Sequence, residues 1–232
     1  MKTKGGALAL ALALALAGCG GGGGEEAEDD PTLTPNTANR DDAAVAADAN
    51  LTLADFPTEW RSSAVPAATS QAAESGARAL AECMNRPPPE EIRTAIAYSD
   101  DFNAQEIRRV SSSVQVVRTE ELAEDDFAAL RTDQALTCHK AQIDAEFARQ
   151  LPAEASPQTA IERLDLPQFA DETVAYRITA TTLERGAQVR RVIDLVFVRK
   201  GRVEAAANFL NVNSPFPSDL QRTLLQRMAA RL

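Results

Sequence analysis

The fold is decided by residues 189–199, VRRVIDLVFVR, which are followed by the pair Lys200-Gly201 and by residues 202–210, RVEAAANFL. Residues 192–198 are apolar at every position except Asp194, a pattern typical of a strand that is buried on both faces. Apolar and small side chains alternate with polar ones in the second segment, and Lys200-Gly201 fits a two-residue turn. The stretch therefore predicts a hairpin at the centre of an antiparallel sheet.

The flanking sequence supplies the other expected elements. Residues 173–183 alternate as a strand should and lead through Arg185-Gly186 into the hairpin, which extends it to a meander. Further strands are expected clearly at 106–118 and weakly at 92–98 and 159–164. Apolar residues recur at helical spacing in four ranges, each of which we expect to be a helix. The ranges are residues 69–84, 119–130, 135–151 and 218–232.

This grouping of elements predicts an α+β domain. Consecutive strands joined by short turns favour a single antiparallel β-sheet, of about five or six strands. The expected helices are amphipathic, so we expect them to pack on one face of that sheet. We place this domain at residues 51–232, after a signal peptide and a flexible tether.

The N-terminus reads as an export signal. Lys2 and Lys4 precede the apolar run Ala7–Ala17, which as a helix would reach only about 16 Å, too short for a bilayer core of roughly 30 Å. Leu16-Ala17-Gly18-Cys19 resembles the lipobox of bacterial lipoproteins. That resemblance implies removal of residues 1–18 and lipidation of Cys19, which would anchor the protein to the outer face of the cell membrane. An ordinary signal peptide with an incidental cysteine is the alternative.

Residues 19–50 are expected to form a disordered acidic tether. A glycine run at Gly20–Gly24 is followed by Pro31 and Pro35. The segment from Glu25 to Asn50 contains eight acidic residues and a single basic one, Arg40. Such composition predicts a flexible, self-repelling segment. The whole chain has a net charge of −10, and this balance argues against nucleic acid as a partner, because phosphate binding requires clustered cations.

The three cysteines of the chain have separate expected roles. Lipidation would modify the thiol of Cys19, which leaves Cys83 and Cys138 as the two remaining cysteines of an exported protein. A disulfide between them is the expected state in an oxidising compartment. Two buried free thiols are the alternative, because cysteine is also a small apolar core residue.

The residue pattern points to no catalytic or metal chemistry. His139 is the only histidine and no Cys-x-x-Cys or His-x-x-x-His spacing is present, so we expect no metal site. The chain has no Gly-x-Ser-x-Gly motif and no glycine-rich phosphate loop in the expected domain. His139 is expected on a helix surface, away from a nucleophile. We therefore predict neither a cofactor nor an enzyme.

Two stretches carry a family resemblance. Residues 53–60, LADFPTEW, and residues 193–202, IDLVFVRKGR, are similar to segments of actinobacterial-type envelope lipoproteins with sensor-like domains. The domain also looks like the PsbP-like fold and the extracellular sensor domain of PknH-type receptor kinases. The resemblance implies an accessory or ligand-binding role in the cell envelope, and no catalytic residues to transfer.

The expected function is therefore a membrane-anchored, non-catalytic domain that binds a ligand or a partner. A carrier of a lipid or other apolar small molecule is the alternative, and an enzyme of unknown type is the third. The expected partners are the membrane, through the lipid anchor, and an envelope protein or a small apolar ligand. The loop after residue 210 offers Asn211, Asn213 and Phe216 as ligand-binding residues. Alternatively, it is a connector whose Phe216 packs into the core.

The lipobox interpretation is tested by replacing its cysteine. The Cys19→Ser variant should be uncleaved or soluble, because multiple acyl chains hold a lipoprotein firmly and no other segment provides an anchor. Metabolic labelling with a radioactive fatty acid followed by immunoprecipitation measures this. Label that persists on the Cys19→Ser form would contradict lipidation at this position.

Overall fold

The computed structural model describes residues 37–105, 107–150, 157–184 and 187–232. The predicted signal peptide, Cys19 and the first part of the tether lie outside this range. Within it, every helix is too short or too polar to cross a bilayer. The elements are α1 (Thr37–Ala49), a 3-10 helix (Leu53–Asp55), β1 (Arg61–Ser63), α2 (Ala67–Cys83), α3 (Pro89–Ile92), β2 (Arg93–Tyr98), β3 (Asp101–Ala104), β4 (Arg108–Val117), α4 (Glu120–Leu130), α5 (Asp133–Gln150), β5 (Gln158–Arg163), β6 (Glu172–Glu184), β7 (Ala187–Lys200), β8 (Val203–Val212) and α6 (Ser218–Ala229).

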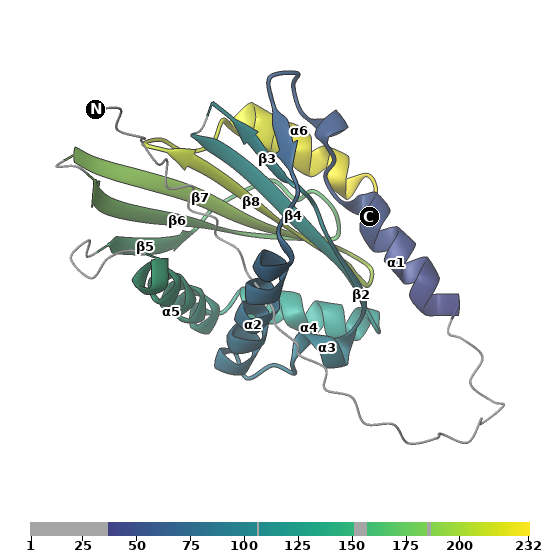
Figure 1. Cartoon of the computed structure of the whole chain (residues 1–232). Coiled ribbons are helices and arrows are strands. Elements are labelled where there is room, and N and C mark those ends of the chain that lie inside the picture. The colour runs from purple at the N-terminus through teal and green to yellow at the C-terminus, as the bar shows by residue number, and fades with distance from the viewer. Residues whose placement is uncertain (1–36, 106, 151–156, 185–186) are drawn as a thin grey trace, which may run out of the picture.

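A single antiparallel sheet of eight strands organises the domain, in the order β1-β3-β4-β8-β7-β6-β5, with β2 also paired to β4 (Figure 1). The predicted α+β class and single antiparallel sheet are confirmed. The predicted number of strands is too low, because the sequence pattern does not reveal β1 and β3. All three residues of β1 are exposed, and β3 is only four residues long and begins at the second residue of the acidic pair Asp100-Asp101.

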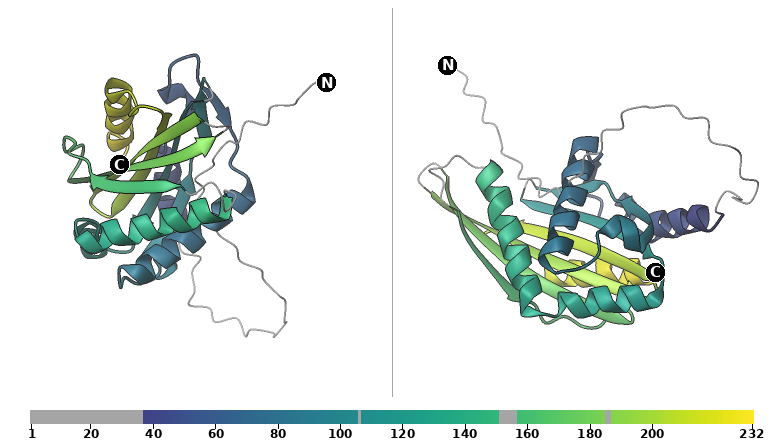
Figure 2. Two further views of the ribbon diagram at one scale, coloured as in Figure 1. Left: turned by 90° about the vertical axis from the view of Figure 1, so that its left-hand side faces the viewer. Right: turned by 90° about the horizontal axis from the view of Figure 1, so that it is seen from below.

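Helices cover both faces of the sheet, so the prediction of helices on one face is wrong (Figure 1; Figure 2). α1 and α6 lie on one face, here called the α6 face, and α2, α4 and α5 lie on the other, the α5 face. The cause is β7, which sends Val196 and Val198 into the core on the α6 face and Ile193 and Leu195 into the core on the α5 face. A strand that is apolar on both sides requires a layer on each.

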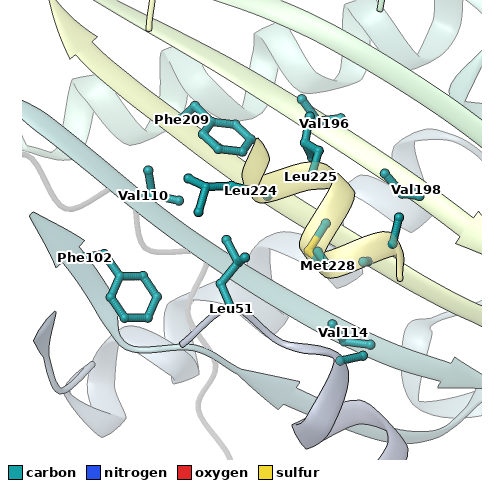
Figure 3. Close-up of a cluster of buried hydrophobic side chains, with 14 of the residues drawn as sticks. Leu51, Phe102, Val110, Val114, Val196, Val198, Phe209, Leu224, Leu225 and Met228 are labelled. Carbon is teal, nitrogen blue, oxygen red and sulfur yellow. The ribbon is translucent and has the colours of Figure 1, made fainter. Parts of the chain in front are cut away.

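The core on the α6 face is built around the last helix. Leu224, Leu225 and Met228 are buried and share one side of α6, as their helical spacing requires. Leu224 lies beside Phe209 of β8 and Val110 of β4 (Figure 3). This apolar contact fixes α6 over the middle of the sheet.

Asp194, the acidic residue inside the apolar run of β7, is fully buried and fully hydrogen-bonded. The guanidinium of Arg177 on β6 donates from Nε to Oδ1 at 2.7 Å and from Nη2 to Oδ2 at 2.8 Å. Gln221 of α6 donates from Nε2 to Oδ2 at 3.1 Å. A buried carboxylate is tolerated when it is paired in this way, so Asp194 connects β6, β7 and α6.

The predicted tether extends too far, because its last part is helix α1 and belongs to the domain. Ala46 and Ala49 are fully buried against the sheet. Asp42 forms an ion pair with Arg202, whose Nη1 lies 3.0 Å from Oδ2, and Asn50 accepts a hydrogen bond from Ser112 at 2.6 Å. Alanine and aspartate dominate α1, so its amphipathic signal is weak and the composition resembles that of a tether.

The predicted disulfide is present, and the alternative of two free thiols is wrong. Cys83 at the end of α2 and Cys138 within α5 are bonded, with their Cα atoms 5.8 Å apart and a sequence separation of 55. The bond joins α2 to α5, and Gln134 of α5 adds a hydrogen bond from Nε2 to the carbonyl of Cys83 at 2.7 Å.

Removal of this bond should destabilise the domain without changing its fold. The Cys83→Ala, Cys138→Ala double variant should lose about 2–4 kcal/mol in free energy of unfolding. The disulfide closes a loop of this length in the unfolded chain and so lowers the conformational entropy of the unfolded state. Denaturant titration of both forms measures the difference. A free-thiol assay on unfolded, unreduced wild type provides the control, and two titratable thiols from this pair would contradict the disulfide.

Candidate functional site

The α5 face of the sheet is incompletely covered over its two central strands. Along the middle of β4 and β8, side chains on the α6 face are buried, whereas most of those on the α5 face are half-buried. Five of these half-buried side chains are polar. Arg109 and Gln115 are hydrogen-bonded to neighbouring side chains, and the other three, Ser111 and Ser113 on β4 and Asn208 on β8, are here called the polar patch. Ser111 lies directly opposite Asn208 in the strand register. The three side chains therefore form one continuous surface.

The polar patch makes no internal hydrogen bonds. None of its three side chains is bonded to another described residue, although a serine hydroxyl both donates and accepts and an asparagine amide offers two donors and an acceptor. Polar groups in the middle of a sheet are usually satisfied within the protein. Half-burial leaves Ser111, Ser113 and Asn208 available to water or to a solute.

Aromatic side chains flank the polar patch. One row of residues crosses four neighbouring strands. Tyr98 of β2 lies opposite Ser113 of β4. Ser113 lies opposite Ala206 of β8, and Ala206 lies opposite Phe197 of β7. Two small residues thus separate two aromatic ones along a single row. The row spans three strand spacings, or roughly 14 Å between the backbones of β2 and β7.

Both aromatic rings are directed away from the sheet toward the helices. The hydroxyl of Tyr98 donates to the carboxylate of Glu74 on α2 at 3.3 Å, and burial, before the charge of Glu74, raises the pKa of Tyr98 to about 12. The ring of Phe197 lies 5.9 Å from the ring of His139 on α5. Tyr98 and Phe197 therefore lie on either side of Ser113 and Ala206, on the α5 face of the sheet.

Helix α2 lies on the same side of the sheet (Figure 2). It is held by the disulfide at Cys83 and by two ion pairs, of Glu74 with Arg93 of β2 and of Arg78 with Glu90 of α3. Among its described side chains, only Ala73 and Ala81 are buried. A helix with such small buried residues gains little from apolar packing.

His139 is buried rather than on a helix surface as predicted. Its ring lies 5.1 Å from the ring of Tyr176 on β6, its residue is 4 % exposed, and its Nε2 has no hydrogen-bond partner. Burial lowers the pKa of His139 to about 4, which keeps the imidazole neutral near pH 7. Next to the polar patch, His139 is therefore an uncharged aromatic residue.

A buried acid lies on the same face of the sheet, on the part of β8 that is near α4. Glu204 of β8 accepts a hydrogen bond from Nε2 of Gln115 on β4 at 2.6 Å, while its Oε1 has no partner. Burial, together with the charge of Asp126 on α4, raises the pKa of Glu204 to about 8. Arg86 holds Asp126 through Nε at 2.9 Å. Glu204 is consequently a neutral carboxylic acid near pH 7.

The predicted binding loop has mainly structural contacts. The amide of Asn211 donates to Ser214 at 2.9 Å and to the carbonyl of Pro215 at 3.0 Å, and Phe216 is buried with its ring 5.2 Å from that of Phe209. Asn213 is exposed, and its side chain accepts from the backbone of Arg190 at 3.1 Å. The loop lies on the α6 side of β8, so it does not meet the polar patch.

Two surface depressions in the described part of the chain do not include the polar patch. One of about 290 Å³ is lined by residues that include Leu51, Tyr98 and Phe102, and one of about 180 Å³ is lined by residues that include Arg131 and Thr173. Both are smaller than usual small-molecule pockets, which measure about 300–1,000 Å³. Over the same residues, no three His, Cys, Asp or Glu side chains converge as a metal site requires.

Sequence reasoning did not identify the polar patch. Alternation along residues 106–118 predicts that Ser111 and Ser113 share one side of a strand, but exposed serines are ordinary on an edge strand. Only the strand order shows that β4 lies inside the sheet. The informative signal would have been polar residues at matching positions of two strands that pair, Ser111 and Asn208.

Comparisons with known proteins assign no family. No protein-family model matches the chain, and no curated protein matches it. Among solved structures, the chain is similar to a protein of unknown function, PA94, from Pseudomonas aeruginosa, with 14% sequence identity and a TM-score of 0.22. That similarity covers 55% of this chain and 71% of the other.

Glu204 should make stability depend on pH in an identifiable direction. Its pKa of about 8 in the fold exceeds the ordinary value of about 4.3, so between these values the folded state holds a proton that the unfolded state has lost. The free energy of unfolding should therefore fall as pH rises from about 5 to 8, by on the order of 3 kcal/mol from this group.

The Glu204→Gln variant, which stays neutral, should lack this decline and be more stable than wild type at pH 9. Urea denaturation at pH 5, 7 and 9 measures the effect, with Glu162→Gln on the exposed surface of β5 as the matched control. Parallel pH profiles for wild type and Glu204→Gln would contradict a neutral Glu204.

Proposed function

We propose that this protein is an exported lipoprotein, anchored to the outer face of the cell membrane by Cys19, whose domain binds a ligand without catalysis. We place the ligand at the polar patch. The observation that carries the proposal is that Ser111, Ser113 and Asn208, in the middle of the sheet, are half-exposed and lack protein partners. Polar groups that converge and lack partners within the protein are a common feature of binding sites.

Two observations support the exported location. The N-terminal sequence has the charged start, the apolar run and the lipobox-like cysteine described above. Cys83 and Cys138 form a disulfide, and structural disulfides are typical of proteins in oxidising compartments. With α1 beginning at Thr37, the tether between Cys19 and the domain comprises 19–36.

Binding without catalysis is favoured over the two other candidates. The described depressions of about 290 and 180 Å³ are small for an acyl chain, so a lipid carrier has no observation in its favour. Neither Ser111 nor Ser113 is hydrogen-bonded to a base. The Nε2 atom of His139 has no hydrogen-bond partner, so it is not bonded to a nucleophile either. A serine–histidine pair of the hydrolytic type requires such a contact.

Purification of the full-length protein from its native membrane tests the binding site. Small molecules released by denaturation are identified by mass spectrometry, for wild type and for the Ser111→Ala, Ser113→Ala, Asn208→Ala variant. Each lost hydrogen bond should cost about 0.5–1.5 kcal/mol, so retention of the ligand should fall at least tenfold while the melting temperature changes little.

The control variant is Thr179→Ala, a half-buried threonine of β6 on the α6 face. It should retain the ligand as wild type does. The competing site is tested by Asn211→Ala with Asn213→Ala, which should mainly lower stability because Asn211 holds its own loop. Ligand retention that is insensitive to the polar-patch variant would refute the proposed site.

A further inference from the structure

We propose that the polar patch binds an uncharged saccharide, held between the rings of Tyr98 and Phe197. The inference rests on the proposed function, since it takes the same surface as the binding site, and it adds the chemical class of the ligand. It is carried by the neutrality of the site, by the kind of hydrogen-bonding groups in it, and by the two rings on either side.

The site offers no free charge to a ligand. Arg109, beside Ser111 on β4, donates from Nε to Asp101 of β3 at 3.0 Å. Glu74 of α2, above Tyr98, is paired with Arg93. A charged ligand that covered the polar patch would lose hydration without gaining a counter-charge, which costs several kcal/mol. An uncharged ligand avoids this cost.

The hydrogen-bonding groups match hydroxyl and amide groups. Ser111 and Ser113 each donate and accept, and Asn208 directly opposite Ser111 adds an amide donor pair and an acceptor. Sugar hydroxyls also both donate and accept, so adjacent hydroxyls of one ring can satisfy neighbouring members of the polar patch. An acyl chain would cover the same three groups and leave them unsatisfied, at a cost of about 1–3 kcal/mol each.

The flanking rings suit the apolar side of a sugar. The C–H groups of a pyranose form a flat face that packs against an aromatic ring, and aromatic residues combine large contact area with little conformational freedom to lose. Tyr98 is fixed upright by Glu74 and Phe197 by its contact with His139. The backbones of their strands are separated by roughly 14 Å, and only the small side chains of Ser113 and Ala206 lie between the two rings in the strand register.

The test uses full-length protein in a zwitterionic detergent, because glycoside detergents would compete. N,N′-diacetylchitobiose and maltose are titrated as neutral disaccharides, glucuronic acid as the charged control and laurate as the apolar control. Backbone amide shifts in nuclear magnetic resonance spectra are followed at Ser113 and Asn208, and at Thr179 on the α6 face. We expect saturable shifts at Ser113 and Asn208 with at least one neutral disaccharide, and none with glucuronic acid or laurate.

Two variants separate binding from loss of structure. The Ser111→Ala, Ser113→Ala, Asn208→Ala variant should bind the disaccharide at least tenfold more weakly, and Ser113→Trp should block it by filling the gap beside Ala206. Thr179→Ala should bind as wild type does. If one of these two variants does not fold, the other variant and the titration of the wild type still test saccharide binding.

The outcomes distinguish the ligand class from the proposed function. Shifts at the polar patch with laurate or glucuronic acid, and none with the disaccharides, would overturn the saccharide assignment but retain the binding site. The absence of shifts with every probe would also overturn it. The proposed function fails separately, when molecules retained from the native membrane do not depend on Ser111, Ser113 and Asn208.

Discussion

Burial of β7 on both faces is the constraint on which the rest of the domain depends. Because Val196 and Val198 face one way and Ile193 and Leu195 the other, the sheet needs two helical layers. On the α5 face, α4 and α5 follow the apolar residues of β6 and β7. Over the middle of β4 and β8 that same face carries serine, alanine and asparagine, so little apolar surface draws a helix onto it. The partial exposure of the polar patch follows from that difference.

The disulfide holds α2 in place, whereas apolar packing holds α6 in place. α6 buries Leu224, Leu225 and Met228, whereas the described part of α2 buries Ala73 and Ala81 only. A covalent bond can hold a helix in place without large side chains beneath it. A helix held in this way can lie beside a polar surface, and the arrangement is stable where disulfides persist, outside the reducing cytoplasm.

Sequence alone predicted the parts of the fold that depend on local pattern. The strands at 173–183, 189–199 and 202–210 and the helix at 119–130 agree with β6, β7, β8 and α4 within a few residues, because alternation and helical spacing are local properties. The boundary of α1 and the depth of His139 depend on tertiary contacts that no local pattern encodes. The candidate site likewise required the strand order, which is a non-local property.

Accessibility of the two sides of β4 tests the central claim, that the sheet is open on the α5 face and closed on the α6 face. Single cysteines are introduced into the full-length, disulfide-bonded protein by Ser113→Cys and by Val114→Cys, its neighbour on the closed side, which is fully buried. The rate of reaction with a neutral maleimide is then measured under native conditions. The account predicts that Ser113→Cys reacts at least tenfold faster than Val114→Cys, and that denaturant removes the difference. Equal protection of both cysteines in the folded protein would show that the polar patch is closed to solutes and would contradict the account.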